Sequence, residues 1–187
     1  DPIDGTKGWL AGSQDYCINI ALVQYGLPVL AVIYAPALSL AYYADSSGAY
    51  RLVNGLRHLM RASAGRDLHD LRLLTGVFHR IDDMVQRFMP HWLANLNCMN
   101  SALKFCSIAS GLADIYVRLG ATGLWDAAAG QFIVEQAGGC VVDFSGKKLQ
   151  YRPEFGLINS PFIVLGNPEH LPAVIKLCQT IRGYYDK

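Results

Sequence analysis

Two short motifs, far apart in the chain, constrain its fold more than any other feature. The chain begins D-P-I-D-G-T (residues 1–6), and W-D-A-A-A-G (residues 125–130) follows about 120 residues later. Asp1 and Asp4 can present two carboxylates to one cation or to two, and Asp126 supplies a third. Oxygen ligands of this kind suit Mg²⁺, which shares its protein sites with substrate phosphates. A fold that joins the two motifs would therefore build a cation site beside a phosphate.

The first motif has the backbone properties of a ligand-binding turn. Pro2 stiffens the turn, and Gly5 lets the backbone approach a ligand closely. The carbonyl of Ile3 is a further candidate metal ligand. The amides of Gly5 and Thr6 would face a phosphate if a helical turn began there. Taken alone, an ordinary Asp-rich surface turn explains the motif equally well.

The second motif is expected at the start of a helix over residues 126–137. Asp126 is predicted to cap this helix, and Gly138-Gly139 to end it. For a lone Asp at this place a plain N-cap is the simpler explanation. A capping Asp can still turn one oxygen towards a metal, and the pairing with the first motif favours that interpretation.

Composition narrows the class of protein. A chain of 187 residues makes one large domain or two small ones, and 52% hydrophobic against 17% charged residues argues against disorder. A net charge of +1 gives no basic surface for nucleic acid. No run of apolar residues is long enough to span a membrane. The cysteines are scattered and form no C-x-x-C pair, which indicates a reducing compartment, and we predict a cytoplasmic protein. They are Cys17, Cys98, Cys106, Cys140 and Cys178.

The chain divides near residue 60. Up to that point short apolar runs joined by tight turns predict an antiparallel meander, the remainder of an N-terminal α+β subdomain over residues 1–60. Its strands are expected at 16–23, 29–35, 40–44 and 49–53. After it, strands alternate with helices, which predicts an α/β subdomain over residues 61–187. Strands are expected there at 72–75, 113–119, 141–144 and 162–165, and helices at 82–89, 101–110 (with Ser101 as N-cap), 126–137 and 168–180.

Together the two motifs resemble the inositol monophosphatase superfamily of Mg²⁺-dependent, Li⁺-sensitive phosphatases. Three stretches resemble one branch of it, the CysQ-type 3′(2′),5′-bisphosphate nucleotidases. They are D-P-I-D-G-T-K (residues 1–7), S-A-L-K-F-C (101–106) and A-D-I-Y-V-R-L (113–119). These enzymes hydrolyse 3′-phosphoadenosine 5′-phosphate (PAP) to AMP and phosphate, recycling a by-product of sulfate assimilation.

The resemblance implies a fold, a cofactor and a ligand. The fold would be a layered αβαβα sandwich of α/β (α+β) class, with an N-terminal segment absent before Asp1. The cofactor would be two or three Mg²⁺ ions, with inhibition by Li⁺. The ligand would be a small phosphorylated nucleotide, and the resemblance leaves both a monomer and a homodimer open.

The resemblance also implies roles for individual residues. The metal ligands would be Asp1, Asp4, Asp126 and the Ile3 carbonyl. Gly5 and Thr6 would bind the scissile 3′-phosphate, and Thr6 would help to position the attacking water. The 5′-phosphate, which is not cleaved, would be held by Ser101, Lys104 and Arg118. The catalytic residues would be Asp4, Thr6 and Asp126. A second phosphate needs cations, which Lys and Arg supply.

The sequence departs from the branch at several points. Ala102 replaces the second serine of S-S-L-K, and Asn100 replaces the preceding glycine. Of the segment S-R-S-H only His79 is kept, where a contact with the base and an ordinary surface histidine are the two interpretations. A metal-ligating glutamate pair and an Asp that pairs with the Thr would precede Asp1.

Two other functions remain open at this stage. An inositol or sugar monophosphate phosphatase would use the same metal site, but it would have no need of a second cationic pocket. A non-catalytic fragment or homologue would bind only a ligand or a partner subunit.

Overall fold

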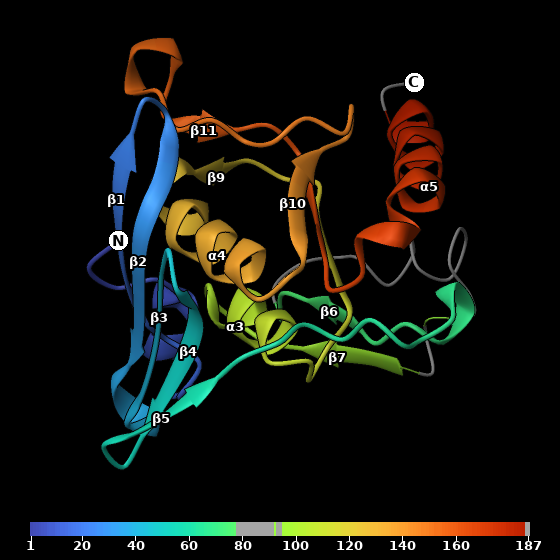
Figure 1. Cartoon of the computed structure of the whole chain (residues 1–187). Helices are drawn as coiled ribbons and strands as arrows, with labels where there is room; N and C mark the ends of the chain where they lie inside the picture. Colours follow the sequence, from blue (N-terminus) through green and yellow to red (C-terminus); the bar gives the residue numbers. More distant parts are fainter. Residues whose placement is uncertain (78–91, 93–94, 186–187) are drawn as a thin grey trace.

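The computed structural model describes residues 1–77, 92 and 95–185 and contains two five-stranded sheets (Figure 1). The first sheet is antiparallel throughout, with its strands in chain order. They are β1 (Ile18–Gln24), β2 (Leu27–Ala35), β3 (Leu40–Asp45), β4 (Gly48–Val53) and β5 (Leu56–Leu59). The four predicted strands of the meander are confirmed, and β5 is an addition to them.

Two-residue turns connect neighbouring strands of this meander. Tyr25 and Gly26 join β1 to β2 with φ of 53° and 82°, and Asn54 and Gly55 join β4 to β5 with φ of 51° and 77°. Positive φ at both central residues gives the turn whose twist matches antiparallel strands. Asn-Gly is a favoured sequence for this turn, so Asn54-Gly55 is a sequence signal for the hairpin that adds β5.

The second sheet is mixed, in the order β10-β12-β8-β6-β7. The pairs β6–β7 and β6–β8 are parallel, and the others are antiparallel. The strands are β6 (Leu73–Thr75), β7 (Leu96–Cys98), β8 (Ile115–Arg118), β10 (Cys140–Asp143) and β12 (Phe162–Leu165). A separate two-stranded sheet pairs β9 (Thr122–Gly123) with β11 (Ile158–Asn159). Strands β7, β9 and β11 are too short to have been predicted from periodicity.

Helices fill the space between the two sheets and cover the far face of the second (Figure 1). The α-helices are α1 (Thr6–Leu10), α3 (Leu103–Ala109), α4 (Leu124–Gln136) and α5 (Leu171–Tyr185). The 3-10 turns are η1 (Pro36–Leu38), η2 (Leu68–Asp70), η4 (Pro153–Phe155) and η5 (Pro168–His170). The described layers therefore run sheet, helices, sheet, helix. The predicted α/β (α+β) class with alternating layers is confirmed.

Strand alternation separates two cores. In β12, Phe162 and Val164 face α3 and α4, whereas Ile163 and Leu165 face α5. All four side chains are at most 1% exposed, as expected for a strand that is covered on both sides. In the first sheet, by contrast, every second side chain of β1 and β2 faces away from the helices, and these include the exposed Ile20, Leu22, Val32 and Tyr34.

Small residues let α4 lie close to its neighbours. Ala127, Ala128 and Ala129 are buried against the first sheet and α3. A Cβ atom at Gly130 would overlap the ring of Phe105 on α3. The W-D-A-A-A-G motif thus sets the spacing between the two middle-layer helices.

Two expected helix starts are wrong. Ser101 does not cap α3, because it adopts a left-handed conformation (φ 56°) and Ala102 is the N-cap. Asp126 does not cap α4 either. That helix begins two residues earlier at Leu124, with Gly123 as N-cap, so Asp126 is its third residue.

Most of the predicted elements after residue 60 are present in the structure. The strands at 72–75, 113–119, 141–144 and 162–165 and the last helix are confirmed. The expected helix 82–89 lies outside the described residues. The subdomain division at residue 60 stays a prediction. No helix in the described ranges combines the length and apolarity that crossing a membrane requires.

We expect Gly130→Ala to destabilise the fold, because the added methyl group must displace the Phe105 ring. Overpacking of a core costs about 1–3 kcal/mol, which urea unfolding will measure. Gly183→Ala is the matched control, since Gly183 lies on α5 with open space around its Cα. This control gains helix propensity and should be neutral or slightly stabilising. Equal stability of the two variants would contradict the close α3–α4 packing.

Candidate active site

The first motif is held in place by the first strand of the antiparallel sheet. The Asp4 N–H donates to the Cys17 carbonyl (2.8 Å), and the Cys17 N–H donates back to the Asp4 carbonyl (3.1 Å). The Asn19 N–H donates to the Asp1 carbonyl (2.8 Å). Residues 1–4 therefore run antiparallel beside the start of β1, which fixes the backbone of both aspartates.

A change of direction follows directly after Asp4. Gly5 has φ of 87°, and a Cβ there would lie 2.9 Å from the Asp15 carbonyl oxygen and 3.1 Å from the Ser101 Cβ. Only glycine fits this conformation in this space. Helix α1 begins at Thr6, so the helical turn expected at the end of the motif is present.

The Asp4 carboxylate lies at the centre of a hydrogen-bond network. Its Oδ2 accepts from the Ala102 backbone N–H (2.5 Å) and from Asn19 Nδ2 (3.1 Å). The Cys17 thiol in turn donates to Asn19 Oδ1 (3.2 Å). Burial raises the pKa of Asp4, the Asn19 hydrogen bond opposes this shift, and the negative charge of Asp126 adds to it.

The third carboxylate comes from the first turn of α4. Asp126 Oδ2 accepts from the Thr122 hydroxyl (2.7 Å) and from the Gly123 N–H (2.9 Å). The second of these bonds is half of a capping box, in which the third helical residue satisfies the amide of the N-cap residue.

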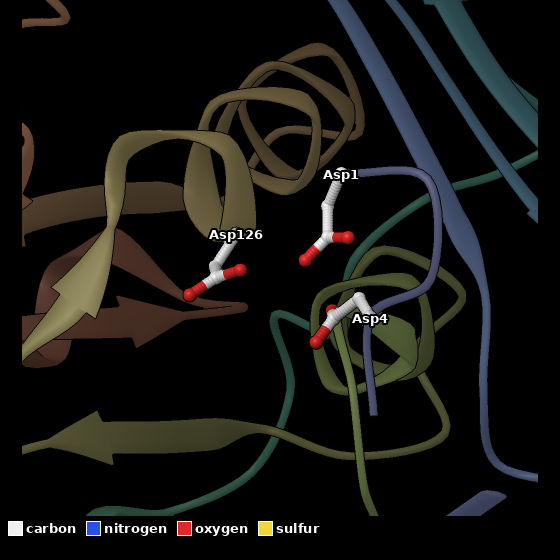
Figure 2. Close-up of side chains that lie close together, drawn as sticks. All are labelled: Asp1, Asp4 and Asp126. Carbon is white, nitrogen blue, oxygen red and sulfur yellow. The ribbon is translucent and has the colours of Figure 1, made fainter. Parts of the chain in front are cut away.

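The three aspartates meet in space, as the sequence predicted. Asp1, Asp4 and Asp126 each offer an oxygen, these atoms all lie within 4.8 Å of one another, and the residues are half-buried. Figure 2 shows the carboxylates of Asp1 and Asp4 on one side and that of Asp126 on the other, all turned towards a common space. Three carboxylates this close repel one another, so a divalent cation among them would relieve the repulsion. The donor set fits a hard cation such as Mg²⁺.

A cavity of about 410 Å³ contains every predicted site residue. The predicted residues that line it are Asp1, Ile3, Asp4, Gly5, Thr6, Ser101, Lys104, Arg118 and Asp126. Thr122, Tyr116 and Phe105 line it as well. The role of the Ile3 carbonyl stays a prediction, and His79 lies outside the described residues.

Lys104 is buried and is therefore not a solvated helix residue. Its ammonium donates to the carbonyls of Ser101 (2.7 Å) and Met99 (3.2 Å) and lies 5.2 Å from the centre of the Tyr116 ring. Ser101, in its left-handed conformation, thus presents its carbonyl oxygen to the Lys104 ammonium. Burial lowers the pKa of Lys104 to about 8, against the opposing effect of the Asp4 charge.

Arg118 ends β8, a central strand of the second sheet. It is partly exposed, and its guanidinium donates to the carbonyls of Ala121 (2.8 Å) and Gly120 (3.2 Å). It thus braces the loop that leads to Thr122 while it lines the cavity. One cavity is thus lined by a three-carboxylate cluster and by the cationic residues Lys7, Lys104 and Arg118.

Comparison with known proteins agrees with this geometry. The model of the inositol monophosphatase family matches residues 1–183. The chain belongs to the inositol monophosphatase family. Phosphatases of this family are metal-dependent, typically on Mg²⁺.

The similar curated proteins include bisphosphate nucleotidases. The 3′(2′),5′-bisphosphate nucleotidase CysQ of Salmonella typhimurium is 36% identical over 164 residues, and that of Escherichia coli K12 is 34% identical over 167 residues. Each match covers 88% of this chain and 65% of the relative. The chain thus spans somewhat less than two thirds of the length of these relatives.

Solved structures of the family have the same fold. CysQ from Bacteroides thetaiotaomicron is 30% identical, with a TM-score of 0.75 over 88% of this chain and 68% of that one. The IMPase of Thermotoga maritima is also 30% identical, with a TM-score of 0.78 over 98% and 68%.

Two residues of the site had no signal in the sequence analysis. Asn19 lies within the apolar strand β1 and Thr122 in the two-residue strand β9, and each hydrogen-bonds an aspartate of another element. The alternation of β1 could have revealed Asn19, because it is the one polar residue of that strand on the buried face.

We expect Mg²⁺ to raise the melting temperature of the chain through the aspartate cluster. A ligand that binds only the folded state stabilises it by about 2.7 kcal/mol at one hundred times its dissociation constant. Asp4→Asn and Asp126→Asn should fold and lose most of this shift, because each removes a charge that holds the cation. Differential scanning calorimetry with and without Mg²⁺ measures the effect.

Asp70→Asn is the control for this experiment, since Asp70 is exposed and does not line the cavity. It should keep the full shift. A full shift in both cluster variants would contradict the metal assignment.

Proposed function

We propose that the chain carries the active site of a Mg²⁺-dependent phosphatase that hydrolyses the 3′-phosphate of PAP to AMP and phosphate. The observation that carries this proposal is the joint presence of the aspartate cluster and of Lys104 and Arg118 in one cavity. A monophosphate needs only the first of these charge sets. A nucleotide with two phosphates uses both, and the similarity to CysQ proteins supports this choice.

The acidic residues of the cavity are assigned to the metal ions. Asp1, Asp4 and Asp126, with the Ile3 carbonyl, would hold two or three Mg²⁺ ions, and Li⁺ would inhibit. A bound Mg²⁺ supplies charge neutralisation at the phosphate oxygens and lowers the pKa of a nearby water.

The scissile phosphate is assigned to the turn that follows Asp4. Gly5 brings its backbone close to the 3′-phosphate, and the Thr6 hydroxyl orients the attacking water. Phosphoryl transfer passes through a loose transition state, so this positioning and the surrounding charge make up most of the catalysis.

The second phosphate is assigned to the cationic end of the cavity. Lys104 and Arg118 would bind the 5′-phosphate, together with Ser101. Burial makes the Lys104 charge costly in the free protein, and a phosphate dianion beside it would offset that cost. The carbonyls of Ser101 and Met99 hold the ammonium in place for this contact.

The test is phosphate release from PAP and from inositol 1-phosphate, with and without Mg²⁺. Mg²⁺-dependent release from PAP alone supports the proposal. Preference for inositol 1-phosphate would keep the metal chemistry and assign the chain to the monophosphatases, which the IMPase neighbour at 30% identity represents. No release from either substrate would favour a chain that only binds a ligand.

We expect Lys104→Met and Arg118→Met to lower kcat/KM for PAP by about 10- to 100-fold, the effect of losing one hydrogen bond to a charged group. Hydrolysis of adenosine 3′-monophosphate, which lacks the 5′-phosphate, should change little. A loss of folded protein would lower both rates equally, so the ratio of the two rates is the measurement. Lys176→Met on α5 is the control. An unchanged ratio in both cavity variants would argue against the 5′-phosphate site.

The pKa of Lys104 predicts a pH dependence of substrate choice. Below about pH 8 the ammonium is charged and can bind the 5′-phosphate, and above it the amine is neutral. The preference for PAP over adenosine 3′-monophosphate should therefore fall as the pH rises from 7 to 9, because kcat/KM reports groups of the free enzyme. Arg118 stays charged and should retain part of the preference. A constant ratio over this range would contradict the role of Lys104.

We further propose that the protein works in the cytoplasm. All five cysteines are free, which suits a reducing compartment.

A homodimer remains an expectation for sedimentation analysis to test.

A further inference from the structure

Two members of the aspartate cluster, Asp126 and Asp4, are held by a similar arrangement of donors. In Asp126 one oxygen, Oδ2, accepts from a backbone N–H (Gly123, 2.9 Å) and from a side chain (Thr122, 2.7 Å). In Asp4 one oxygen, again Oδ2, accepts from a backbone N–H (Ala102, 2.5 Å) and from a side chain (Asn19, 3.1 Å). Among the described residues, each carboxylate thus accepts from one backbone N–H and one nitrogen or hydroxyl side-chain donor on the same oxygen, and Asp4 Oδ2 has in addition a longer contact from the Cys17 thiol (3.9 Å).

With Oδ2 of each aspartate occupied by hydrogen bonds, Oδ1 is the oxygen that can bind a cation. A carboxylate oxygen has about two lone-pair sites, and two donors use both of them. The second oxygen, Oδ1, then remains for a cation. A carboxylate fixed in this way offers one ligand atom in one direction, whereas a freely rotating carboxylate can turn away or bind through both oxygens.

The side-chain donors come from strands rather than from the segments that carry the aspartates. Thr122 lies in β9 and pairs with Asn159 of β11. The buried Asn159 side chain donates to the Gly123 carbonyl (2.7 Å), which locks the turn between β9 and α4. The Thr122 hydroxyl therefore reaches Asp126 from a backbone that the two-stranded β9–β11 sheet supports.

Asn19 is oriented in a similar way. It lies on the buried face of β1, where its Oδ1 accepts from the Cys17 thiol. This bond leaves the amide nitrogen to donate to Asp4. Neither Asn19 nor Thr122 belongs to the two motifs.

We propose that Thr122 and Asn19 are positioning residues, which hold one oxygen of Asp126 and of Asp4 so that the other oxygen is presented to the cation. The inference rests on the proposed metal site and goes beyond it by assigning its supporting residues. Partners that orient metal ligands in this way are typically worth 10- to 100-fold in metal affinity or activity.

The test is the affinity of the full chain for Mn²⁺, measured by electron paramagnetic resonance of the free ion, without substrate. Thr122→Val keeps the shape and the β-branched character of the side chain and removes the hydroxyl. We expect it to weaken Mn²⁺ binding by about 10- to 100-fold. Thr122→Ser keeps a hydroxyl at this position. Its Mn²⁺ affinity should lie within about threefold of that of the original chain if the hydrogen bond, and not the side-chain volume, positions Asp126.

Thr75→Val is the matched control. The Thr75 hydroxyl is buried and has no hydrogen-bond partner among the described residues, so the same chemical change removes no bond to them. It should leave Mn²⁺ affinity unchanged. Asn19→Leu tests the second positioning residue by the same measurement, with circular dichroism as the check of folding, and it too should weaken binding.

The outcomes separate this inference from the proposed function. Weak binding in Thr122→Val and Asn19→Leu, with recovery in Thr122→Ser, supports it. Unchanged Mn²⁺ affinity in both Thr122→Val and Asn19→Leu overturns the inference. If Asp126→Asn abolishes binding in the same experiment, the proposed metal site is still supported. Unchanged affinity in Asp126→Asn overturns the metal site and the inference together.

Discussion

The hydrogen bond from the Ala102 N–H to the Asp4 carboxylate joins the two parts of the cavity. Asp4 belongs to the segment beside β1, and Ala102 is the N-cap of α3, 98 positions further along the chain. Two residues after this N-cap, Lys104 lines the same cavity. The distance between the anionic and the cationic ends of the site is therefore set by this contact and by the packing of α3 against α4.

The middle helices depend on small side chains for the same reason. Gly130 allows Phe105 to lie against α4, and the alanines before it allow the first sheet to approach. Larger residues would move Asp126 away from Asp1 and Asp4. The small residues of the W-D-A-A-A-G motif thus have a steric role, apart from the carboxylate that the motif contains.

The sequence predicted the parts of the site that carry charge, because charged residues in short motifs are visible without a structure. It placed the three aspartates, Lys104 and Arg118 in one cavity only through resemblance, since no local pattern reports a contact across 98 residues. The expected helix caps Ser101 and Asp126 lie one and three positions away from the observed N-caps Ala102 and Gly123. In both cases a different local hydrogen bond replaces the expected N-cap bond: the Ser101 carbonyl accepts from Lys104, and the Asp126 carboxylate accepts from Thr122 and Gly123. The short strands β7, β9 and β11 exist only through their pairing partners and had no periodicity to predict them.

The aspartate cluster connects the first residue of the chain to the middle helical layer. A cation held there closes a loop of about 120 residues, as a cross-link would. Its binding energy would therefore oppose the opening of the whole structure rather than that of one segment. Amide hydrogens of both sheets, far from the ion, would then exchange more slowly when it is bound, and cation supply would act on the lifetime of the folded chain as well as on its chemistry.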